Sequence, residues 1–267
     1  MFNQSWDAPQ GNGNGGEKRT YTFWLRPGEA KRIIFLQDAP IQVWEHELYV
    51  LTKKSESHVC PVRNKIGDHC AICDLSDEIK KDKGLWPRLV GYSTVLDIGM
   101  VEWRNGEVMI TPPVDRDGNP RPEFMGSKRL FRGKWGSEEK PSTWRILADK
   151  RQRIGTLMFT VWDVKRLGNK DPRVGSTFEF VTKLDSKEAV LEYLKSMGVP
   201  TDRISADLVE MINYSQELKP LSDQYITGIL ATAGLISAPV ASESAPNFGV
   251  PLSDATGGNT VDDPFDM

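Results

Sequence analysis

Every cysteine and every histidine of this chain lies within one short stretch of the sequence. The 267 residues include three cysteines and three histidines, and all six fall between positions 46 and 73. Cys60, Cys70 and Cys73 have the spacing C-x9-C-x2-C. A Cys-x-x-Cys turn presents two thiolates to one metal ion, and zinc binds such thiolates at about 2.3 Å. The spacing therefore predicts a zinc site with three cysteine ligands; three buried free cysteines are the alternative.

The fourth zinc ligand is expected to be a histidine, and three are available. His69 directly precedes a cysteine ligand, and neighbouring side chains point in different directions, so it is the poorest candidate. His58 stands two residues before Cys60 and would face the same side of a strand. A hairpin that turns near residue 53 would pair positions summing to about 106, which sets His46 opposite Cys60. We favour His46, and His58 stays open as the alternative.

Four protein ligands would leave the zinc ion without an open coordination position. Catalytic zinc keeps one position for water or substrate, whereas structural zinc is closed by four side chains. The sequence has no histidine outside the cysteine-rich stretch to act as a base, and its acidic residues are scattered. We therefore expect a structural zinc ion that clamps a loop, in a protein that is not an enzyme.

The composition is that of a globular protein with an uneven charge distribution. Hydrophobic residues make up 39% of the chain and charged residues 27%. Residues 116–173 hold 15 Lys and Arg against 7 Asp and Glu, whereas residues 235–267 hold five acids and no Lys or Arg. This asymmetry predicts a polyanionic partner and a tail that competes with it. The polar start of the chain and the interrupted apolar stretch 225–241 predict a cytoplasmic protein with no membrane partner.

Short strands dominate the expected secondary structure, with helices towards the C-terminus. Stretches rich in β-branched and aromatic residues alternate with turn sequences, which favours a sandwich or a barrel, the OB-fold being one candidate. After residue 184 the apolar residues recur at helical spacing, so we expect a mostly β fold with C-terminal helices (α+β). The expected strands are 21–26, 31–37, 41–52, 89–99, 107–111, 156–164 and 176–184, and the expected helices are 186–198, 203–215 and 221–234.

These elements divide the chain into four expected segments. Gly- and Asn-rich residues 1–19 are expected to form a flexible arm. Residues 20–184 are expected to form an OB-fold-like β-barrel with a zinc-binding subdomain inserted at about 44–84. Residues 185–234 are expected to form a helical segment, and residues 235–267 are expected to form a disordered acidic tail.

Basic and aromatic residues alternate in several places in the expected core. Single-stranded nucleic acid needs both types, because cations follow the phosphates and planar rings stack on unpaired bases. Gly133 and Gly136 predict an exposed loop around one such segment, and residues 165–175 add four cations between two expected strands. The nucleic-acid contacts expected on these grounds are Lys128, Arg129, Phe131, Arg132, Lys134, Trp135, Lys150, Arg151, Arg153, Lys165, Arg166, Lys170 and Arg173.

The chain ends in acidic residues around one aromatic ring. A flexible acidic segment can occupy a basic groove when nucleic acid is absent, and its ring offers partner proteins an apolar anchor. The residues of this expected partner-binding tail are Asp262, Asp263, Pro264, Phe265 and Asp266.

Together these features resemble the zinc-containing single-stranded DNA-binding proteins of tailed phages, of the T-even helix-destabilising type. The motif C-x9-C-x2-C has that family's spacing, with His46 as its upstream histidine. The stretch WPRLVGYSTVLDIG followed by NGEVM is similar to the family's basic-aromatic strand, which implies DNA contact at Arg88 and Tyr92. The Asp-Asp-Pro-Phe ending is also similar to the tip of bacterial single-stranded DNA-binding proteins.

The resemblance implies a protein that coats single-stranded DNA without sequence preference during phage replication, recombination and repair. It implies the cytoplasm of an infected bacterial cell, and recruitment of phage or host replication and recombination proteins by the tail. The family's basic motif for self-association is reduced here to residues 18–20, so self-association on DNA stays open. The alternatives are a zinc-ribbon accessory domain of a nucleic-acid enzyme and a transcription factor acting on duplex DNA.

Overall fold

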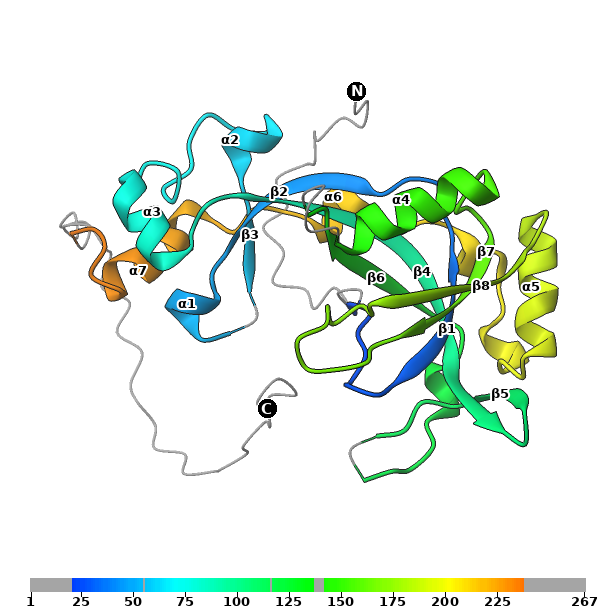
Figure 1. Ribbon diagram of the computed structural model, residues 1–267. Helices are drawn as coiled ribbons and strands as arrows, with labels where there is room; N and C mark the ends of the chain where they lie inside the picture. The colour runs from blue at the N-terminus through cyan, green and yellow to red at the C-terminus, as the bar shows by residue number, and fades with distance from the viewer. Residues whose placement is uncertain (1–20, 55, 116, 137–141, 238–267) are drawn as a thin grey trace, which may run out of the picture. The chain divides into compact units, whose positions relative to one another are not determined.

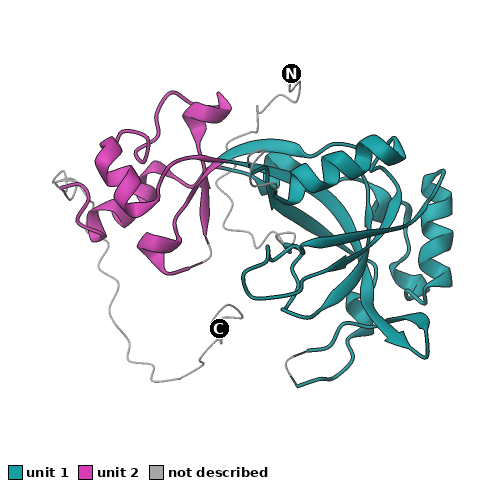
Figure 2. Cartoon of the chain, viewed as in Figure 1, with its two compact units in different colours: residues 1–44, 89–219 teal, residues 45–88, 220–267 magenta. Residues whose placement is uncertain are grey.

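The computed structural model describes residues 21–54, 56–115, 117–136 and 142–237 (Figure 1). The chain forms two compact units, shown in different colours in Figure 2. Unit 1 comprises residues 1–44 and 89–219, and unit 2 comprises residues 45–88 and 220–267. No helix in the described ranges is long and apolar enough to cross a membrane.

Unit 1 is mostly β, built on an open antiparallel sheet. The path of hydrogen-bonded neighbours in this unit runs β2-β4-β1-β7-β8, and β5 and β6 also pair with β4. β2 and β4 continue into unit 2. The strands are β1 (Ala30–Phe35), β2 (Ile41–Glu47), β4 (Arg88–Arg104), β5 (Glu107–Thr111), β6 (Ser127–Lys134), β7 (Thr160–Lys165) and β8 (Thr177–Lys183).

Both faces of the sheet in unit 1 are covered, which explains the consecutive apolar residues of β1. Phe35 packs in one buried cluster with Trp144 of α4 (Thr143–Ile154). Ile34, on the opposite face, packs in a second cluster with Leu194 of α5 (Lys187–Ser196). Successive side chains of a strand point to opposite faces, so a strand buried on both sides is apolar throughout. Figure 1 shows α4 and α5 flanking the strands.

A pair of glycines lets α4 approach the sheet closely. Gly91 of β4 lies opposite Gly133 of β6. The indole nitrogen of Trp144 donates a hydrogen bond to the Gly91 carbonyl oxygen at 2.8 Å. A Cβ atom on Gly91 would lie 2.3 Å from that nitrogen, and one on Gly133 would lie 2.9 Å from it. The two glycines therefore form the slot that holds the Trp144 ring.

Several expected elements are confirmed, and others differ. β5 has the expected bounds, and α5 and α7 (Asp223–Thr232) lie within expected helices. The expected strand 41–52 ends at Glu47 and is followed by a helical turn, and residues 21–26 make only an isolated bridge. β6 and α4 were not expected.

The expected helix 203–215 is wrong. Its place is taken by the 3-10 turns η2 (Thr201–Arg203) and η3 (Ala206–Val209) and by the short helix α6 (Tyr214–Glu217). The reason is tertiary hydrogen bonding to Thr94 of β4. The Ile212 amide donates to the Thr94 hydroxyl oxygen at 3.0 Å, and the Tyr214 hydroxyl lies 2.8 Å from the same oxygen. These bonds outweigh the local helix propensity.

The described part of unit 2 contains one hairpin and several short helices. β2 pairs with β3 (Ser57–Val59), and the connection contains α1 (Tyr49–Thr52). α2 (Pro61–Asn64) and α3 (Asp77–Lys83) follow in sequence, and α7 belongs to the same unit. Its buried apolar side chains include Leu48, Ile72, Leu75, Leu85, Ile226 and Leu230.

Candidate metal centre and nucleic-acid interface

Four side chains of unit 2 converge on one point and could hold a metal ion. The ligand atoms of His46, Cys60, Cys70 and Cys73 all lie within 4.8 Å of one another. The sulfur of Cys73 lies 3.5 Å from that of Cys60 and 3.4 Å from the Nε2 atom of His46. In a tetrahedral site with ligands at about 2.0–2.3 Å, neighbouring ligand atoms are about 3.5–3.8 Å apart. The pairs Cys60–Cys73, Cys70–His46 and Cys73–His46, at 3.4–3.5 Å, are close to this spacing, and the remaining pairs lie within 4.8 Å.

A hydrogen bond to the carbonyl oxygen of another segment orients the histidine of this cluster. The Nδ1 atom of His46 donates to the carbonyl oxygen of Leu85 at 2.7 Å. A carbonyl only accepts, so the proton sits on Nδ1 and the lone pair of Nε2 faces the sulfur atoms. Metal-binding histidines are commonly fixed in this way by a partner outside the first ligand shell. The imidazole is fully buried and is therefore held in a ligand-competent orientation.

Local backbone structure places the cysteines. Cys60 is the N-cap of α2, and its sulfur accepts a hydrogen bond from the Arg63 amide at 3.5 Å. Cys70 and Cys73 lie in a turn closed by the Asp74 amide, which donates to the Cys70 carbonyl oxygen at 3.2 Å. Hydrogen bonding with Cys70 lowers the pKa of the Cys60 thiol, whereas burial raises the pKa of the Cys73 thiol. A bound divalent ion would deprotonate all three thiols.

The structure brings His46 to the three cysteines and holds the other two histidines apart. His58 is buried, but its Nδ1 atom accepts a hydrogen bond from the Leu221 amide at 3.3 Å. His69 is exposed and lies 2.9 Å from the carboxylate of Asp74. The expected hairpin register was wrong, because His46 pairs with His58 and the paired numbers sum to 104. The helical turn α1 lies in the connection of the hairpin, so the paired strands end before it. Cys60 follows the last residue of β3 and joins the cluster from there.

Three aromatic residues expected at the DNA surface are core or partly buried. Phe131 is fully buried in the aromatic cluster of unit 1, and Tyr92 is 4% exposed. Trp135 is half-buried and stacks on Trp144, with 6.5 Å between ring centroids. The expected exposed loop around Gly133 was wrong, because that glycine belongs to β6 and packs against Trp144. As placed, Phe131 and Tyr92 cannot stack on a base.

Several of the expected cations are engaged within the protein. Arg88 forms an ion pair with Glu47 in unit 2, and Arg151 forms one with Asp38 in unit 1. The Lys150 ammonium lies 5.7 Å from the centre of the Trp162 ring. Lys134 is exposed and also has an interaction within the protein. These contacts reduce the capacity of the four side chains to bind a phosphate.

Three further cations of β6, Lys128, Arg129 and Arg132, also have partners within the protein. The Lys128 ammonium donates to the Asp207 carbonyl oxygen at 2.7 Å, and Arg132 Nε donates to the Tyr92 hydroxyl at 3.2 Å. The Arg129 guanidinium lies 5.3 Å from the centre of the Tyr21 ring and 5.8 Å from that of Phe124. Burial lowers the pKa of both Lys128 and Arg129.

The last residue of β7 and the loop that follows it carry three exposed cations. The side chains of Lys165, Lys170 and Arg173 are exposed and have no hydrogen-bond or ion-pair partner among the described residues. Arg153 shares these properties, but it lies beyond the other end of β7, at the end of α4. Arg166 is structural, because its guanidinium donates to the Leu25 and Asn169 carbonyl oxygens at 2.9 and 3.0 Å. The segment therefore presents three of the four expected loop cations to solvent.

An exposed tryptophan that sequence reasoning missed lies on the segment that packs against this loop. The Leu25 amide donates to the Arg173 carbonyl oxygen at 2.8 Å, which fastens residues 24–29 to the loop. Trp24 is 43% exposed, and the Arg26 guanidinium lies 5.8 Å from its ring centre. The alternation of buried Phe23 and Leu25 with exposed Trp24 was the available signal. We call Trp24, Arg26, Lys165, Lys170 and Arg173 the loop surface.

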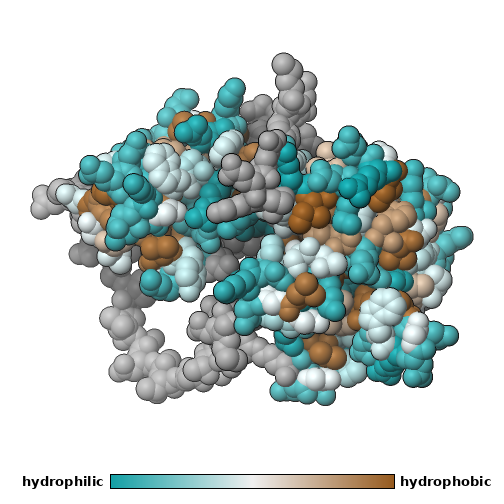
Figure 3. All heavy atoms as spheres, in the orientation of Figure 1, coloured by the Kyte–Doolittle hydropathy of each residue, from teal (hydrophilic) through white to brown (hydrophobic). Residues whose placement is uncertain are grey.

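The surface of both units is largely polar in the view of Figure 3, with apolar residues in separate patches. The expected tail residues Asp262, Asp263, Pro264, Phe265 and Asp266, and the expected arm 1–19, lie outside the described residues. No protein-family model matches the chain, and no curated protein is similar to it in sequence.

Proposed function

We propose that this protein binds single-stranded DNA without sequence preference. The observation that carries the proposal is the loop surface, where the segment that carries the exposed indole ring of Trp24 is hydrogen-bonded to a loop whose cations Lys170 and Arg173 have no partner among the described residues. Unpaired bases expose a π-face that stacks on such a ring whatever the sequence, and cations bind the phosphates. Paired bases are already stacked, so the surface favours the single strand.

The order of the elements in unit 1 supports a relation to the OB-fold. Of the strands that precede the helix α4, we assign β1, β4 and β6 to the first three strands of an OB-fold, and we assign β7 and β8, which follow the helix, to the last two. β1 pairs with both β4 and β7. OB-folds are partly open five-stranded barrels that bind oligonucleotides through the loops after their first and fourth strands. In this assignment the loop surface contains the loop after the fourth strand, and unit 2 is inserted after the first.

We further propose that the metal is zinc and that it is structural. Three thiolates and one imidazole are a common zinc ligand set, and four protein ligands leave no position for a reacting water. Few of the described residues of unit 2 have buried apolar side chains, and a metal ion would supply stability that so small a core lacks. In this proposal the protein acts by binding alone and is not an enzyme.

The biological role proposed from the family resemblance is that of a phage protein of replication, recombination and repair in an infected bacterial cell. The acidic end of the chain, residues 262–266, would recruit replication and recombination proteins and compete with DNA for the loop surface. Both effects follow from charge and from the single aromatic ring of that segment, Phe265.

Fluorescence titration of the full-length, zinc-loaded protein tests the binding proposal. The ligands are oligo-dT, a matched RNA oligonucleotide and a DNA duplex of equal length, each at two salt concentrations. We expect oligo-dT to bind more tightly than the duplex, with an affinity that falls as salt rises. Preference for the duplex would favour the alternative of a transcription factor. Absence of binding to any of the three ligands would refute a nucleic-acid function.

A further inference from the structure

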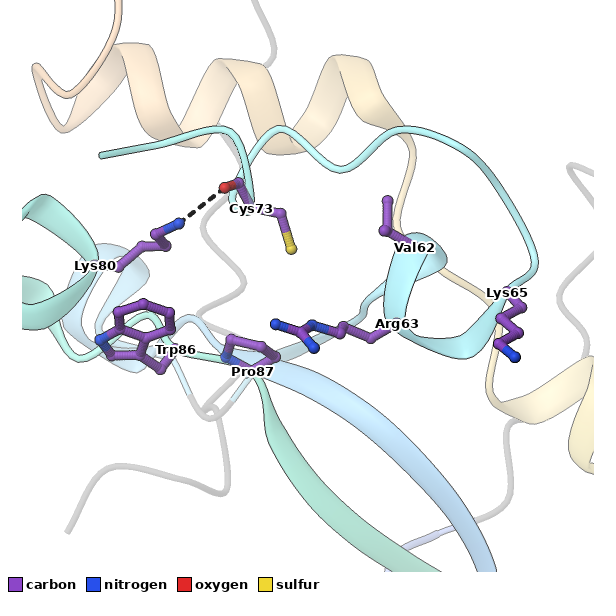
Figure 4. A pocket seen from close by; sticks show the side chains of 7 residues that line it. All are labelled: Val62, Arg63, Lys65, Cys73, Lys80, Trp86 and Pro87. Carbon is purple, nitrogen blue, oxygen red and sulfur yellow. Dashed lines mark hydrogen bonds between the residues drawn. The ribbon is translucent and has the colours of Figure 1, made fainter. Parts of the chain in front are cut away.

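Unit 2 contains a pocket of about 460 Å³ beside the metal centre, shown in Figure 4. This volume lies within the roughly 300–1,000 Å³ typical of small-ligand sites. The sulfur of Cys73 points towards the space, and the Arg63 guanidinium extends from α2 towards Pro87 and Trp86. The described residues that line it are Val62, Arg63, Lys65, Cys73, Lys80, Trp86 and Pro87.

The charges of this pocket are suited to an anion. Three of its lining residues are cations and none is acidic. The side chains of Arg63 and Lys65 have no hydrogen-bond or ion-pair partner among the described residues. Lys80 is engaged, because its ammonium donates to the Cys73 carbonyl oxygen and lies 2.9 Å from the Asp77 carboxylate. Figure 4 shows the Arg63 guanidinium extending into the pocket and the Lys65 side chain pointing away from it on the other side of α2, so Arg63 is the cation placed to bind a phosphate there.

The aromatic side chain of the pocket is held in place and exposed. Trp86 is 42% exposed, and the Lys80 ammonium lies 5.0 Å from its ring centre. This contact, with the proline that follows, restrains the indole without burying it. A planar ring that needs no reordering stacks on a base at a smaller entropic cost than a mobile one.

We propose that this pocket holds one nucleotide of a single-stranded DNA chain, with its base against Trp86 and a phosphate bound by Arg63. A free anion would use the Arg63 cation but leave the indole unused, and an apolar ligand would leave that cation without a partner. A nucleotide uses both. The inference rests on the proposed function and adds a second contact site, in unit 2, to the loop surface of unit 1.

The metal centre would shape this pocket directly. Cys60 caps the helix that carries Arg63, and Cys73 is itself part of the pocket wall. His46 is hydrogen-bonded to Leu85, the residue before Trp86. Loss of the metal would therefore loosen the segments that carry both the cation and the ring, so nucleotide binding here requires the ion.

Two substitutions with matched controls test the pocket in the full-length, metal-loaded protein. Trp86→Ala removes the ring, and Trp103→Ala removes another exposed tryptophan, from β4 in unit 1. Arg63→Ala and Lys81→Ala each remove one exposed positive charge from unit 2, but only Arg63 lines the pocket. Fluorescence anisotropy with a labelled dT oligonucleotide gives the affinity at several salt concentrations. Metal content and melting temperature establish that each variant is folded.

We expect Trp86→Ala to weaken binding about fivefold or more, the lower end of what one stacked base contributes. Arg63→Ala should lower the slope of log affinity against log salt by about 0.7, the value for one phosphate on a single strand. Both controls should stay within about twofold of the unaltered protein. An oligonucleotide carrying 5-iododeoxyuridine should photocrosslink to the tryptic peptide of residues 84–88, which contains Trp86.

The outcomes separate this inference from the proposed function. If the unaltered protein binds dT but both pocket variants match their controls and the crosslink maps elsewhere, the pocket is not a nucleotide site and the proposed function stands. If the unaltered protein binds no single-stranded DNA, both the pocket inference and the proposed function are refuted. If Trp86→Ala or Arg63→Ala loses metal, Trp86→Phe and Arg63→Lys repeat the test with smaller changes, and the crosslink is read on the unaltered protein.

Discussion

The Nδ1 atom of His46 lies 2.7 Å from the carbonyl oxygen of Leu85 and donates a hydrogen bond to it. This bond joins two segments of unit 2 that are far apart in sequence. It directs the Nε2 atom towards the cysteine sulfur atoms, and it anchors the residue that precedes Trp86. One histidine thus links the metal centre to the wall of the neighbouring pocket.

Replacement of His46 should therefore cost the protein its metal. His46→Ala removes one of four ligands and leaves the Leu85 carbonyl oxygen without this donor. We expect a fall in zinc affinity of more than about 100-fold, because removal of an outer-shell partner alone commonly costs 10–100-fold. Competition with a chromogenic chelator measures the affinity. His69→Ala, at an exposed residue outside the cluster, is the control and should bind metal normally. Equal zinc affinity in the two variants would contradict the ligand assignment.

Removal of cations from the loop surface should weaken the binding of single-stranded DNA and its dependence on salt. Lys170→Ala combined with Arg173→Ala removes two exposed cations from the loop between β7 and β8. The slope of log affinity against log salt for oligo-dT should fall by about 0.7 for each phosphate that is no longer neutralised, and the affinity should fall several-fold at low salt. Lys195→Ala combined with Lys183→Ala removes the same charge from exposed positions outside the loop surface. Identical salt slopes for the two double variants would remove this loop from the interface.

The sequence was most informative where chemistry restricts residue types. Thiolates and imidazoles are scarce here, so their spacing predicted the cluster that the structure brings together. His46 was preferred as a ligand on the basis of a hairpin register that is wrong by two positions. The error arose because the alternating sequence pattern does not reveal the helical turn within the hairpin. The pocket beside the cluster was not predicted, since Arg63 and Trp86 are brought together only by folding.

Strands with regular alternation were predicted well, and elements decided by tertiary contacts were not. β5 has the expected bounds, whereas a loop was expected in the place of β6 because this segment contains glycine. Glycine usually weakens a strand, but Gly133 is there to admit the ring of Trp144. Trp144 itself belongs to α4, which was not expected because its basic residues were interpreted as nucleic-acid contacts. The Leu, Ala, Lys, Arg and Gln residues of this segment favour a helix, so local propensity was an available signal.

Substitution of Trp135 distinguishes between a role of this residue in the core and a role in DNA binding. It is half-buried against Trp144, and its indole nitrogen is buried without a partner among the described residues. Trp135→Ala should lower the free energy of unfolding by about 2–3 kcal/mol, because a large ring is removed from a packed site. Trp135→Phe keeps a ring and removes the unpaired N–H group, so it should cost clearly less. Urea denaturation gives both values. Normal stability of Trp135→Ala together with weaker oligo-dT binding would instead place Trp135 at the interface.

Asp38 makes unit 1 sensitive to acid. Its carboxylate accepts hydrogen bonds from the Arg151 guanidinium at 3.0 Å, the Thr156 hydroxyl at 2.7 Å and the Leu157 amide at 2.9 Å. The bond from Arg151 is the largest cause that holds the pKa of Asp38 well below its ordinary value of 3.8. A carboxyl group with a lowered folded-state pKa stabilises the fold above its unfolded-state pKa. That stabilisation is lost as the pH falls towards the folded-state pKa.

Asp38→Asn should accordingly destabilise the protein at pH 7 and matter little in strong acid. Both partners are more than a third exposed, so solvent screening limits the expected loss at pH 7 to about 1 kcal/mol. The stability difference from the unaltered protein should shrink as the pH falls from about 4 towards 2, because the carboxyl group of Asp38 takes up a proton in the unfolded chain over this range while it stays ionised in the folded protein. Urea midpoints measured across this range give the difference. Asp149→Asn removes a charge from an exposed residue of α4 and serves as the control. A difference that stays constant down to pH 2, or that Asp149→Asn reproduces, would show that the Asp38 ion pair does not set the acid response.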